Sequence, residues 1–408
     1  MAGPLSGIRI IDMTTMMSGP LSTMLLGDQG AEVIKVESPE GEVMRKMGLE
    51  HSGMTSSFLC SNKSKRSFSV NVKTKKGLNI LKELITESDV FVQNFRPGTA
   101  ERIGLGEKEL RKINNSIIYV SISGFGEKGP YSNQRVYDPV IQALSGLADI
   151  QKDSETGKPK MVRTVISDKT TALAASQAIC AALYYREKTK IGQHIRLSML
   201  DVMIYYLWPE GSSSLSFIGN ELDPSQNQMG LDLVYKTKDR YITAGAVSDK
   251  EWLGMCKALD REDLINDKRF SNASVRMKNS NERRRITALE IAKYPSGDIL
   301  KKLVAQDVPC APILERKELL ENDQVVINKI FKTHDSPSYG KIRSPRVAAI
   351  FSKTPCKSES LAPILGSDNK DILKELSYTD EQIRLLIKEG VIREKKIPSS
   401  HISRLATK

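Results

Sequence analysis

The chain has 408 residues, with 61 Lys and Arg against 49 Asp and Glu, so its net charge is +12. Its length and 39% hydrophobic content are typical of two or three folding units with a sizeable core, which excludes a disordered or fibrous chain. The longest near-apolar stretch, Ala172–Tyr185, is shorter than the ~18 residues that a membrane span needs. The first residues lack the basic segment of a secretory signal. We therefore expect a soluble, cytoplasmic protein with no membrane partner.

The basic excess favours anionic partners without identifying them. No RNP signature or zinc-finger spacing accompanies it, so we do not expect nucleic acid as a partner. The five cysteines lie far apart, with no C-x-x-C pair, and the chain has only four histidines, so neither a disulfide framework nor a metal site is predicted. Basic residues cluster at Lys63, Lys65 and Arg66, at Lys73, Lys75 and Lys76, and at Arg283–Arg285.

Strands alternate with helices in the first third of the chain. Such alternation predicts a parallel sheet covered on both faces, which is a doubly wound α/β domain. The predicted elements are strand Gly7–Met13, helix Leu21–Asp28, strands Ala31–Glu37 and Phe68–Val72, helix Lys76–Glu87, strand Asp89–Gln93, helix Lys108–Asn114 and strand Ile117–Ser123.

The rest of the chain predicts further helices and a second, smaller α+β unit. The segment Glu210–Gly230 is rich in Gly, Ser, Asn and Gln, and we interpret it as a linker or mobile loop at the first domain boundary. Thr379 and Gln382 have the spacing of a capping box. The predicted elements are helix Asp138–Leu147, an extended run Val162–Ile166, a long helix that follows Asp168 and ends at about Lys188, strand Gln193–Met199, helix Leu200–Leu207, a hairpin within Leu233–Val247, helices Lys250–Leu259, Glu282–Ala292 and Gly297–Gln306, an extended segment Pro309–Leu314, a short strand Arg346–Phe351, and helices Asp371–Leu376 and Asp380–Gly390.

Known ligand-binding motifs exclude some functions. Glu37 ends a strand where an acidic residue could hold a ribose, but the preceding turn contains only Gly19, whereas a dinucleotide fingerprint needs three glycines. No phosphate-binding P-loop and no G-x-S-x-G nucleophile elbow occur in the sequence.

Three segments stand where open α/β sheets bind ligands, or at a helix start. Asn94–Gly98 and Ser121–Gly126 follow predicted strands at their carboxyl ends, although each could be a simple turn. Asp168 is predicted as the last residue before the long helix, where an aspartate is most often an N-cap. A carboxylate in that position is also ionised and rigid, as a nucleophile would need to be.

Together, these segments resemble the family III CoA-transferases over nearly the whole chain, from about Leu5 to about Ile392. Each segment alone is modest evidence, and their common order makes the resemblance specific. The similar segments are GAEVIKVESP (Gly30–Pro39), NKSKRSFSVNVKT (Asn62–Thr74), DVFVQNFRPG (Asp89–Gly98), IIYVSISGFGEKGPY (Ile117–Tyr131), YDPVIQALSGL (Tyr137–Leu147), SDKTTALAASQAICAALYYREKTKIGQ (Ser167–Gln193) and SYTDEQIRLLIKEGVI (Ser377–Ile392).

The resemblance implies a Rossmann-like large domain made from both ends of the chain, a small α+β domain inserted between them, and a homodimer of two interlocked subunits. The corresponding boundaries are residues 1–210 for the first part of the large domain, 211–330 for the linker and small domain, 331–395 for the returning part and 396–408 for a flexible basic tail. Sequence periodicity alone does not predict the interlocking.

The resemblance also implies a reaction in which CoA moves from an acyl-CoA thioester to a free carboxylic acid. Asp168 stands in the position of the family's nucleophile and would pass through anhydride and aspartyl-CoA thioester intermediates, and Asp138 stands where the family has an acidic residue nearby. CoA is then a substrate, and no tightly bound cofactor is implied. The positions that would bind CoA are Met17, Ser18, Val70, Lys73, Asn94, Phe95, Arg96, Arg102, Arg135 and Tyr137.

Two alternatives remain at this stage. A racemase of α-methylacyl-CoA esters shares the fold, but it needs a His-Asp pair where this chain has Tyr137 and Asp138. A non-catalytic basic binding protein is the other alternative. Some family members have Gln at Met17 and Arg at Ser38, and the glycine-rich lid of the formyl-CoA branch is not evident in Gly219–Gly230, so we expect an acceptor other than oxalate. The sequence does not identify the acid pair.

Overall fold

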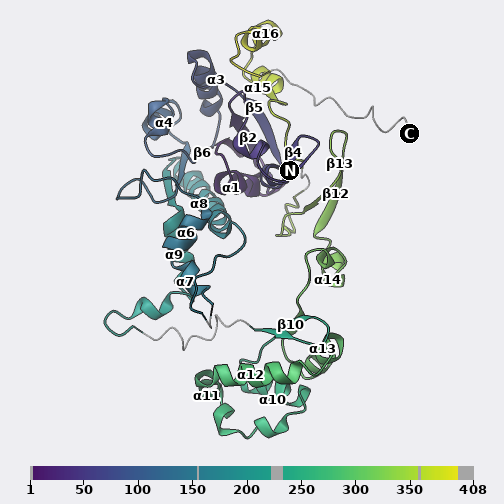
Figure 1. The fold of residues 1–408 in the computed structure, drawn as a ribbon. Helices are drawn as coiled ribbons and strands as arrows, with labels where there is room; N and C mark the ends of the chain where they lie inside the picture. Colours follow the sequence, from purple (N-terminus) through teal and green to yellow (C-terminus); the bar gives the residue numbers. More distant parts are fainter. Residues whose placement is uncertain (1–2, 154–155, 222–232, 357–359, 394–408) are drawn as a thin grey trace, which may run out of the picture. The chain divides into compact units, whose positions relative to one another are not determined.

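The computed structural model describes residues 3–153, 156–221, 233–356 and 360–393. It divides into two compact units (Figure 1). The first contains the chain up to Tyr206 and again from Lys329, and the second is Leu207–Asn328. The predicted tail, 396–408, and most of the segment Gly219–Gly230 lie outside the described residues.

A six-stranded sheet with the order β5-β2-β1-β6-β7-β8 organises the first unit. Every neighbouring pair is parallel, which confirms the predicted α/β class. The strand order reverses between β1 and β6, and this switch point is where open α/β sheets bind ligands. The strands are β1 (Arg9–Met13), β2 (Glu32–Glu37), β5 (Lys65–Ser69), β6 (Val90–Gln93), β7 (Ile118–Ser123) and β8 (His194–Ser198).

Helices cover both faces of this sheet because apolar side chains alternate along its strands. Ile10 and Val92 pack in one buried cluster, whereas Ile11 and Phe91 pack in the other. The first cluster lies under α1 (Ser18–Gly27) and α8 (Ile166–Thr189). The second lies under α3 (Lys75–Thr86), α5 (Glu107–Ile113), α15 (Asn369–Glu375) and α16 (Asp380–Lys388).

The C-terminal helices return to the sheet begun by the N-terminal residues (Figure 1). The backbone N–H of Ser69 donates to Asn369 Oδ1 over 2.7 Å, and Val70 forms a bridge with Ile392. The predicted capping box of Thr379 and Gln382 is present at the start of α16. Two segments separated by about 300 residues therefore share one hydrophobic core.

The strand predicted at Arg346–Phe351 is wrong, because the structure forms a hairpin just before it, from β12 (Phe331–Ser336) and β13 (Gly340–Pro345). Both strands carry mostly polar residues, and neither has a short apolar run like those in Asp89–Gln93 or Ile117–Ser123.

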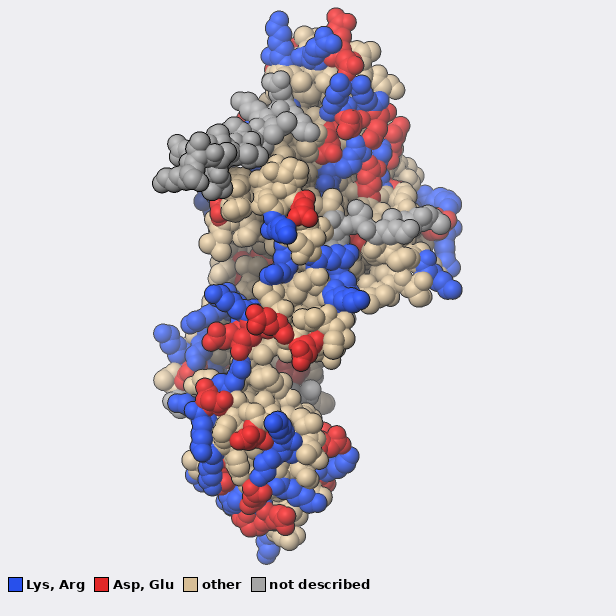
Figure 2. Space-filling view, turned by 90° about the vertical axis from the view of Figure 1, so that its right-hand side faces the viewer, with Lys and Arg blue, Asp and Glu red and all other residues tan. Residues whose placement is uncertain are grey.

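The second unit combines a three-stranded antiparallel sheet with four helices around buried Trp252, Phe270 and Ile299. Lys and Arg are interspersed with Asp and Glu on the face of this unit that Figure 2 shows. The unit also contains ion pairs such as Arg261–Glu290. Its main elements are β9 (Val234–Lys236), β10 (Tyr241–Ala244), β11 (Cys310–Pro312), α10 (Asp249–Ala258), α11 (Ala273–Lys278), α12 (Ser280–Ile291) and α13 (Ser296–Ala305).

Shorter elements complete the chain. Within the described ranges, no helix is long and apolar enough to cross a membrane, and no group of three or more His, Cys, Asp or Glu side chains could hold a metal ion. The remaining elements are η1 (Val43–Arg45), β3 (Glu50–His51), β4 (Met54–Thr55), α2 (Ser56–Ser61), α4 (Thr99–Arg102), α6 (Asp138–Leu144), α7 (Leu147–Ile150), α9 (Met199–Leu207), η2 (Ser213–Ser216), η4 (Glu262–Leu264), η5 (Lys268–Phe270), η6 (Glu318–Leu320) and α14 (Asp323–Ile327).

Candidate active site

A cavity of about 710 Å³ opens in the first unit at the carboxyl ends of β1 and β6. It lies at the switch point of the sheet, where the loops after the two strands diverge. Segments far apart in the sequence line it, including Thr15–Ser18, Asn94–Pro97 and Ile122–Phe125. The structure thus brings three of the predicted ligand-binding regions to one place.

Most predicted site residues line this cavity. The nine that do so are Met17, Ser18, Asn94, Phe95, Arg96, Arg135, Tyr137, Asp138 and Asp168.

Three predicted CoA-binding residues do not line the cavity. The side chain of Val70 is 1% exposed and packs in the core under α15 and α16, so a ligand contact at Val70 would have to use its backbone. Lys73 and Arg102 are exposed, and the Arg102 guanidinium donates a hydrogen bond of 2.7 Å to Thr99 Oγ1. Both cations lie outside the residues that form the cavity wall.

Asp168 lies inside the first turn of α8 and is not its N-cap, which corrects the sequence-based expectation. The helix begins at Ile166, and its N-cap, Val165, makes no side-chain hydrogen bond. The cap comes instead from Asp138, whose Oδ1 accepts hydrogen bonds from the backbone N–H groups of Ser167 (2.6 Å) and Asp168 (3.2 Å). The Asp168 carboxylate is therefore not used in capping its own helix.

The Asp138 carboxylate is 3% exposed and saturated with hydrogen bonds. Its second oxygen accepts from Gln142 Nε2 over 2.6 Å, and Gln142 Oε1 in turn accepts from the backbone N–H of Val162. These bonds attach the segment before α8 to α6. Asp138 thereby fixes the place where Asp168 enters the cavity.

The environment of Asp168 raises the pKa of its carboxyl group to about 6. Burial is the largest cause, and the negative charge of Asp138 adds to it. Hydrogen bonds from the side chain and backbone of Ser18 act in the opposite direction and lower the pKa. Asp168 is accordingly a partly desolvated carboxylate that is mostly ionised at neutral pH and stands near a helix N-terminus.

Charged side chains whose burial the sequence analysis did not predict support the loop that carries Ser18. Lys65, which the sequence placed in a basic cluster, is buried and donates to Asp12 Oδ2 over 2.8 Å. Lys35 is also buried and pairs with Glu42 over 2.8 Å. Charged residues are rarely buried, so local sequence gave no reason to expect this arrangement.

A second cavity, of about 940 Å³, adjoins the first and shares Phe95, Arg96 and Pro97 with it. It lies at the carboxyl ends of β6, β7 and β8. His194 lines this second cavity, and its Nε2 is 2.9 Å from Ser121 Oγ. Among the described residues, no histidine lines the cavity around Asp168, so the His-Asp pair of a racemase is missing from it.

Comparisons with known proteins identify the family of the chain. The family model described as CoA-transferase family III matches residues 5–369. The chain belongs to this family. As a family III CoA-transferase, it transfers CoA between an acyl-CoA and a carboxylic acid.

Individual relatives cover almost the whole transferase. It is 35% identical to succinyl-CoA:glutarate CoA-transferase of Mus musculus, with 96% of this chain and 91% of the relative aligned. It is 32% identical to formyl-CoA:oxalate CoA-transferase of Streptomyces avermitilis, over 96% of this chain and 100% of that protein. The crystal structure of a CAIB/BAIF family protein from Brucella suis superposes with a TM-score of 0.80 at 27% identity, covering 92% of this chain and 100% of that one.

Proposed function

We propose that Asp168 is the nucleophile of the transfer. Its carboxylate attacks the thioester carbonyl of the donor, forming a mixed anhydride and expelling CoA as thiolate. The thiolate then attacks the Asp168 carbonyl of the anhydride, which yields an aspartyl-CoA thioester and releases the donor acid as carboxylate. The acceptor carboxylate repeats both steps in reverse, so acyl-CoA is regenerated and Asp168 returns to its ionised form.

The observation that carries this proposal is a carboxylate in the cavity that does not cap its own helix. Asp138 caps α8, so the oxygens of Asp168 are not taken up by that cap and face Ser18 at a helix N-terminus. A desolvated carboxylate with a pKa of about 6 is a better nucleophile than a fully hydrated one and is still ionised at neutral pH. The hydroxyl and N–H groups of Ser18 and the positive end of the α8 dipole would stabilise negative charge during the transfer.

Two arginines in the cavity wall suit the phosphates of CoA. Arg96 and Arg135 line it from the loops after β6 and β7, and both are exposed enough to meet a ligand entering from solvent. Guanidinium groups bind phosphate through paired hydrogen bonds. Asn94 also lines the cavity, and its amide holds the neighbouring loop by bonding to both the N–H and the C=O of Thr15.

For the acid pair, we propose short dicarboxylates, with succinyl-CoA as a donor. The support is the 35% identity to the mouse succinyl-CoA:glutarate enzyme, whose name states its own substrates. A screen of donors and acceptors that follows free CoA, acyl-CoA exchange and α-proton exchange tests this choice. Exchange of the α-proton without transfer would favour the racemase reaction instead.

Trapping the intermediate tests the nucleophile directly. During incubation with acyl-CoA, hydroxylamine should convert Asp168 into its hydroxamate, and borohydride should reduce the same residue, both visible by peptide mass spectrometry. The Asp168→Asn protein provides the matched control and should remain unlabelled and inactive. A label confined to another carboxylate, or full activity in Asp168→Ala, would contradict the proposal.

We also propose that the transferase is a homodimer, as the family resemblance implies. The first unit leaves large apolar side chains exposed, among them Leu173 and Tyr184 of α8 and Tyr205 of α9. Large exposed apolar groups on neighbouring helices are typical of protein interfaces.

A further inference from the structure

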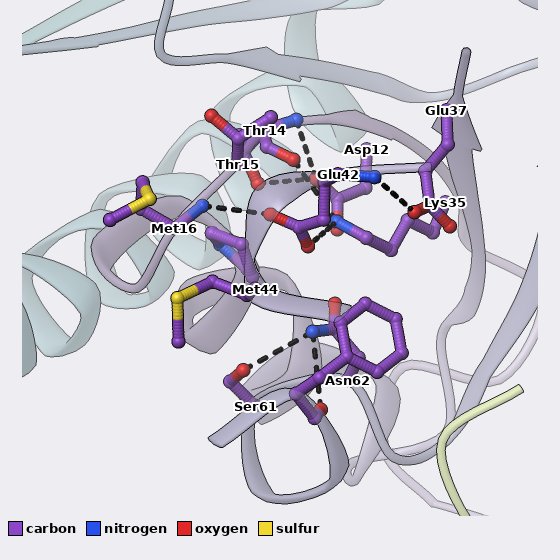
Figure 3. A network of polar contacts seen from close by, with 12 residues as sticks. Asp12, Thr14, Thr15, Met16, Lys35, Glu37, Glu42, Met44, Ser61 and Asn62 are labelled. Atoms are coloured by element: carbon purple, nitrogen blue, oxygen red, sulfur yellow. Dashed lines mark hydrogen bonds and ion pairs between the residues drawn. The ribbon is translucent and has the colours of Figure 1, made fainter. Parts of the chain in front are cut away.

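The loop from Thr14 to Met16, which connects β1 to α1, is held by side chains at nearly every backbone polar group (Figure 3). The N–H of Thr14 donates to Asp12 Oδ1 over 2.9 Å, and its C=O accepts from Lys35 Nζ over 3.0 Å. The N–H of Met16 donates to Glu42 Oε2 over 2.9 Å. Because loop backbone is usually satisfied by water, this degree of side-chain anchoring marks a segment whose position is fixed.

Met16 itself adopts an unfavourable backbone conformation. Its φ is +68°, in the left-handed region that non-glycine residues rarely occupy. The next residues are Met17, the N-cap of α1, and Ser18, which lines the same cavity as Asp168 and lowers the pKa of its carboxyl group. The conformation of Met16 therefore sets where α1 begins relative to the carboxylate.

Glu42 is the residue that links this strained position to the core. It follows β2, its side chain is buried, and its two oxygens face different partners: Oε2 meets the N–H of Met16, and Oε1 pairs with Lys35 over 2.8 Å. Its backbone N–H donates to Glu37, which Arg45 holds through two hydrogen bonds. Glu42 is thus anchored on both its side chain and its backbone.

Residues of the sheet support the ion pair of Lys35 and Glu42. Lys35 of β2 is directly opposite Asp12 of β1, and Asp12 is paired with Lys65 of β5. Lys65 donates its three hydrogen bonds to Asp12, to the C=O of Pro20 and to Asn62. A buried ion pair adds little net stability compared with apolar residues, so its retention here calls for another explanation.

We propose that Glu42, through its pair with Lys35, is a positioning residue that holds Met16 in its left-handed conformation and thereby sets Ser18 against the nucleophile Asp168. This inference rests on the proposed role of Asp168. Glu42 touches neither substrate nor Asp168, so its effect passes through the loop.

The charged groups around both residues decide which measurement reports on this role. Asp138 of α6 faces Asp168, and Arg96 and Arg135 share its cavity. The titratable neighbours of Glu42 are Lys35, Glu37, Asp12, Arg45 and Lys65. If the loop relaxes, Asp168 loses the hydrogen bonds of Ser18 that lower its pKa, whereas its burial and Asp138 remain. The acid limb of the pH profile of kcat should then move to higher pH. A loss of stability alone would not cause this shift.

The first experiment compares Glu42→Gln with Glu32→Gln, a matched control on β2 whose carboxylate pairs with Arg9 and Arg66 away from the loop. We expect Glu42→Gln to lower kcat at least tenfold and to move the acid limb up by half a pH unit or more. Glu32→Gln should keep both values. A folded Glu42→Gln enzyme with an unmoved limb and kcat within threefold of the parent would overturn the proposal.

Because Glu42→Gln leaves Lys35 buried without its partner, the double variant Glu42→Leu/Lys35→Met is the second test. Apolar replacement of a buried ion pair commonly preserves stability, so this protein should fold while lacking the anchor of Met16. We expect the same loss of kcat and the same limb shift, and normal values in a folded double variant would refute the positioning role. If hydroxylamine trapping of the parent enzyme fails to label Asp168, the proposed function fails first, and the two outcomes stay distinguishable.

Discussion

Asp138 binds the backbone N–H of Asp168 through Oδ1, at 3.2 Å, and that of Ser167 at 2.6 Å. One carboxylate therefore caps the helix that presents the other. The arrangement has an electrostatic consequence, because the capping charge stands close to Asp168 and adds to the effect of burial on its pKa. Positioning and pKa adjustment are performed by the same side chain.

The first prediction concerns the pH dependence of transfer. The nucleophile must be ionised, and burial followed by the charge of Asp138 raises the pKa of Asp168 to about 6. With acids that are themselves ionised above pH 5, kcat should rise tenfold per pH unit below about 6 and level off above it. Asp138→Asn keeps an Oδ1 acceptor for the helix but removes the charge, so the acid limb should move to lower pH. A limb that stays in place would show that Asp138 does not act on Asp168 electrostatically.

The second prediction concerns stability. The pKa of Asp168 is raised from 3.8 to about 6 on folding, so the folded state binds the proton more tightly than the unfolded one. This group therefore destabilises the fold above pH 6, and the effect disappears as the pH falls below about 4. Asp168→Asn should raise the free energy of unfolding at pH 7.5 by up to about 3 kcal/mol and leave it nearly unchanged at pH 4.

Urea denaturation at the two pH values measures this difference. Asp149→Asn is a suitable control, because the Asp149 side chain is 73% exposed and lies on α7, outside the residues that line the cavity around Asp168. Equal or lower stability of Asp168→Asn at pH 7.5 would contradict a costly, buried carboxylate. Removal of a functional group is expected to stabilise an enzyme when that group is held ionised in a desolvated place.

The third prediction distinguishes three cations that the sequence analysis assigned equally to CoA binding. Arg96 lines the cavity, whereas Arg102 bonds to Thr99 and Lys73 lies in solvent. Loss of a charge-assisted hydrogen bond costs ~1.5–3 kcal/mol, so Arg96→Ala should raise the KM for acyl-CoA by roughly ten- to a hundredfold and change kcat less. Arg102→Ala and Lys73→Ala should each raise KM less than threefold. Steady-state kinetics of the three variants with one acyl-CoA measures these KM values. Equal effects of all three substitutions would place the CoA phosphates elsewhere.

The strands of the sheet were predicted well because each strand can be recognised from a short run of neighbouring residues. Short apolar runs such as those in Asp89–Gln93 and Ile117–Ser123 correspond to β6 and β7 within one residue, and the cavity lies at the switch point of the sheet. The hairpin of β12 and β13 was missed because its residues are mostly polar on both faces.

The support of the site could not be predicted locally. The cap of α8 comes from Asp138, thirty residues before Asp168, so a local cap search chose the wrong residue. Burial of Lys35 and Lys65 depends on carboxylates of other segments, and only the folded chain brings Asp12 and Glu42 to them. Which charges pair across long sequence distances depends on the tertiary structure and cannot be predicted from any short segment of the sequence.

The last prediction concerns assembly. Residues near Ile392 and Val70 complete one core although the second unit is inserted between them in sequence, so the first unit closes the chain on itself. If a second copy threads through this closed chain, as the family resemblance implies, the subunits cannot separate without partial unfolding, and their interface should exceed the ~1,600 Å² of an ordinary complex. Burial of Tyr205, now 84% exposed, would supply part of that area.

Folding and dimerisation would then be one event. Analytical ultracentrifugation at nanomolar concentration should still find a particle of twice 45.4 kDa, and the midpoint of reversible denaturation should rise with protein concentration. Tyr205→Glu should lower that midpoint by placing a charge in the interface, whereas Tyr241→Glu, at an exposed position of the second unit, should change it less. A folded, active monomer would exclude the interlocked assembly without testing the role of Asp168 as nucleophile.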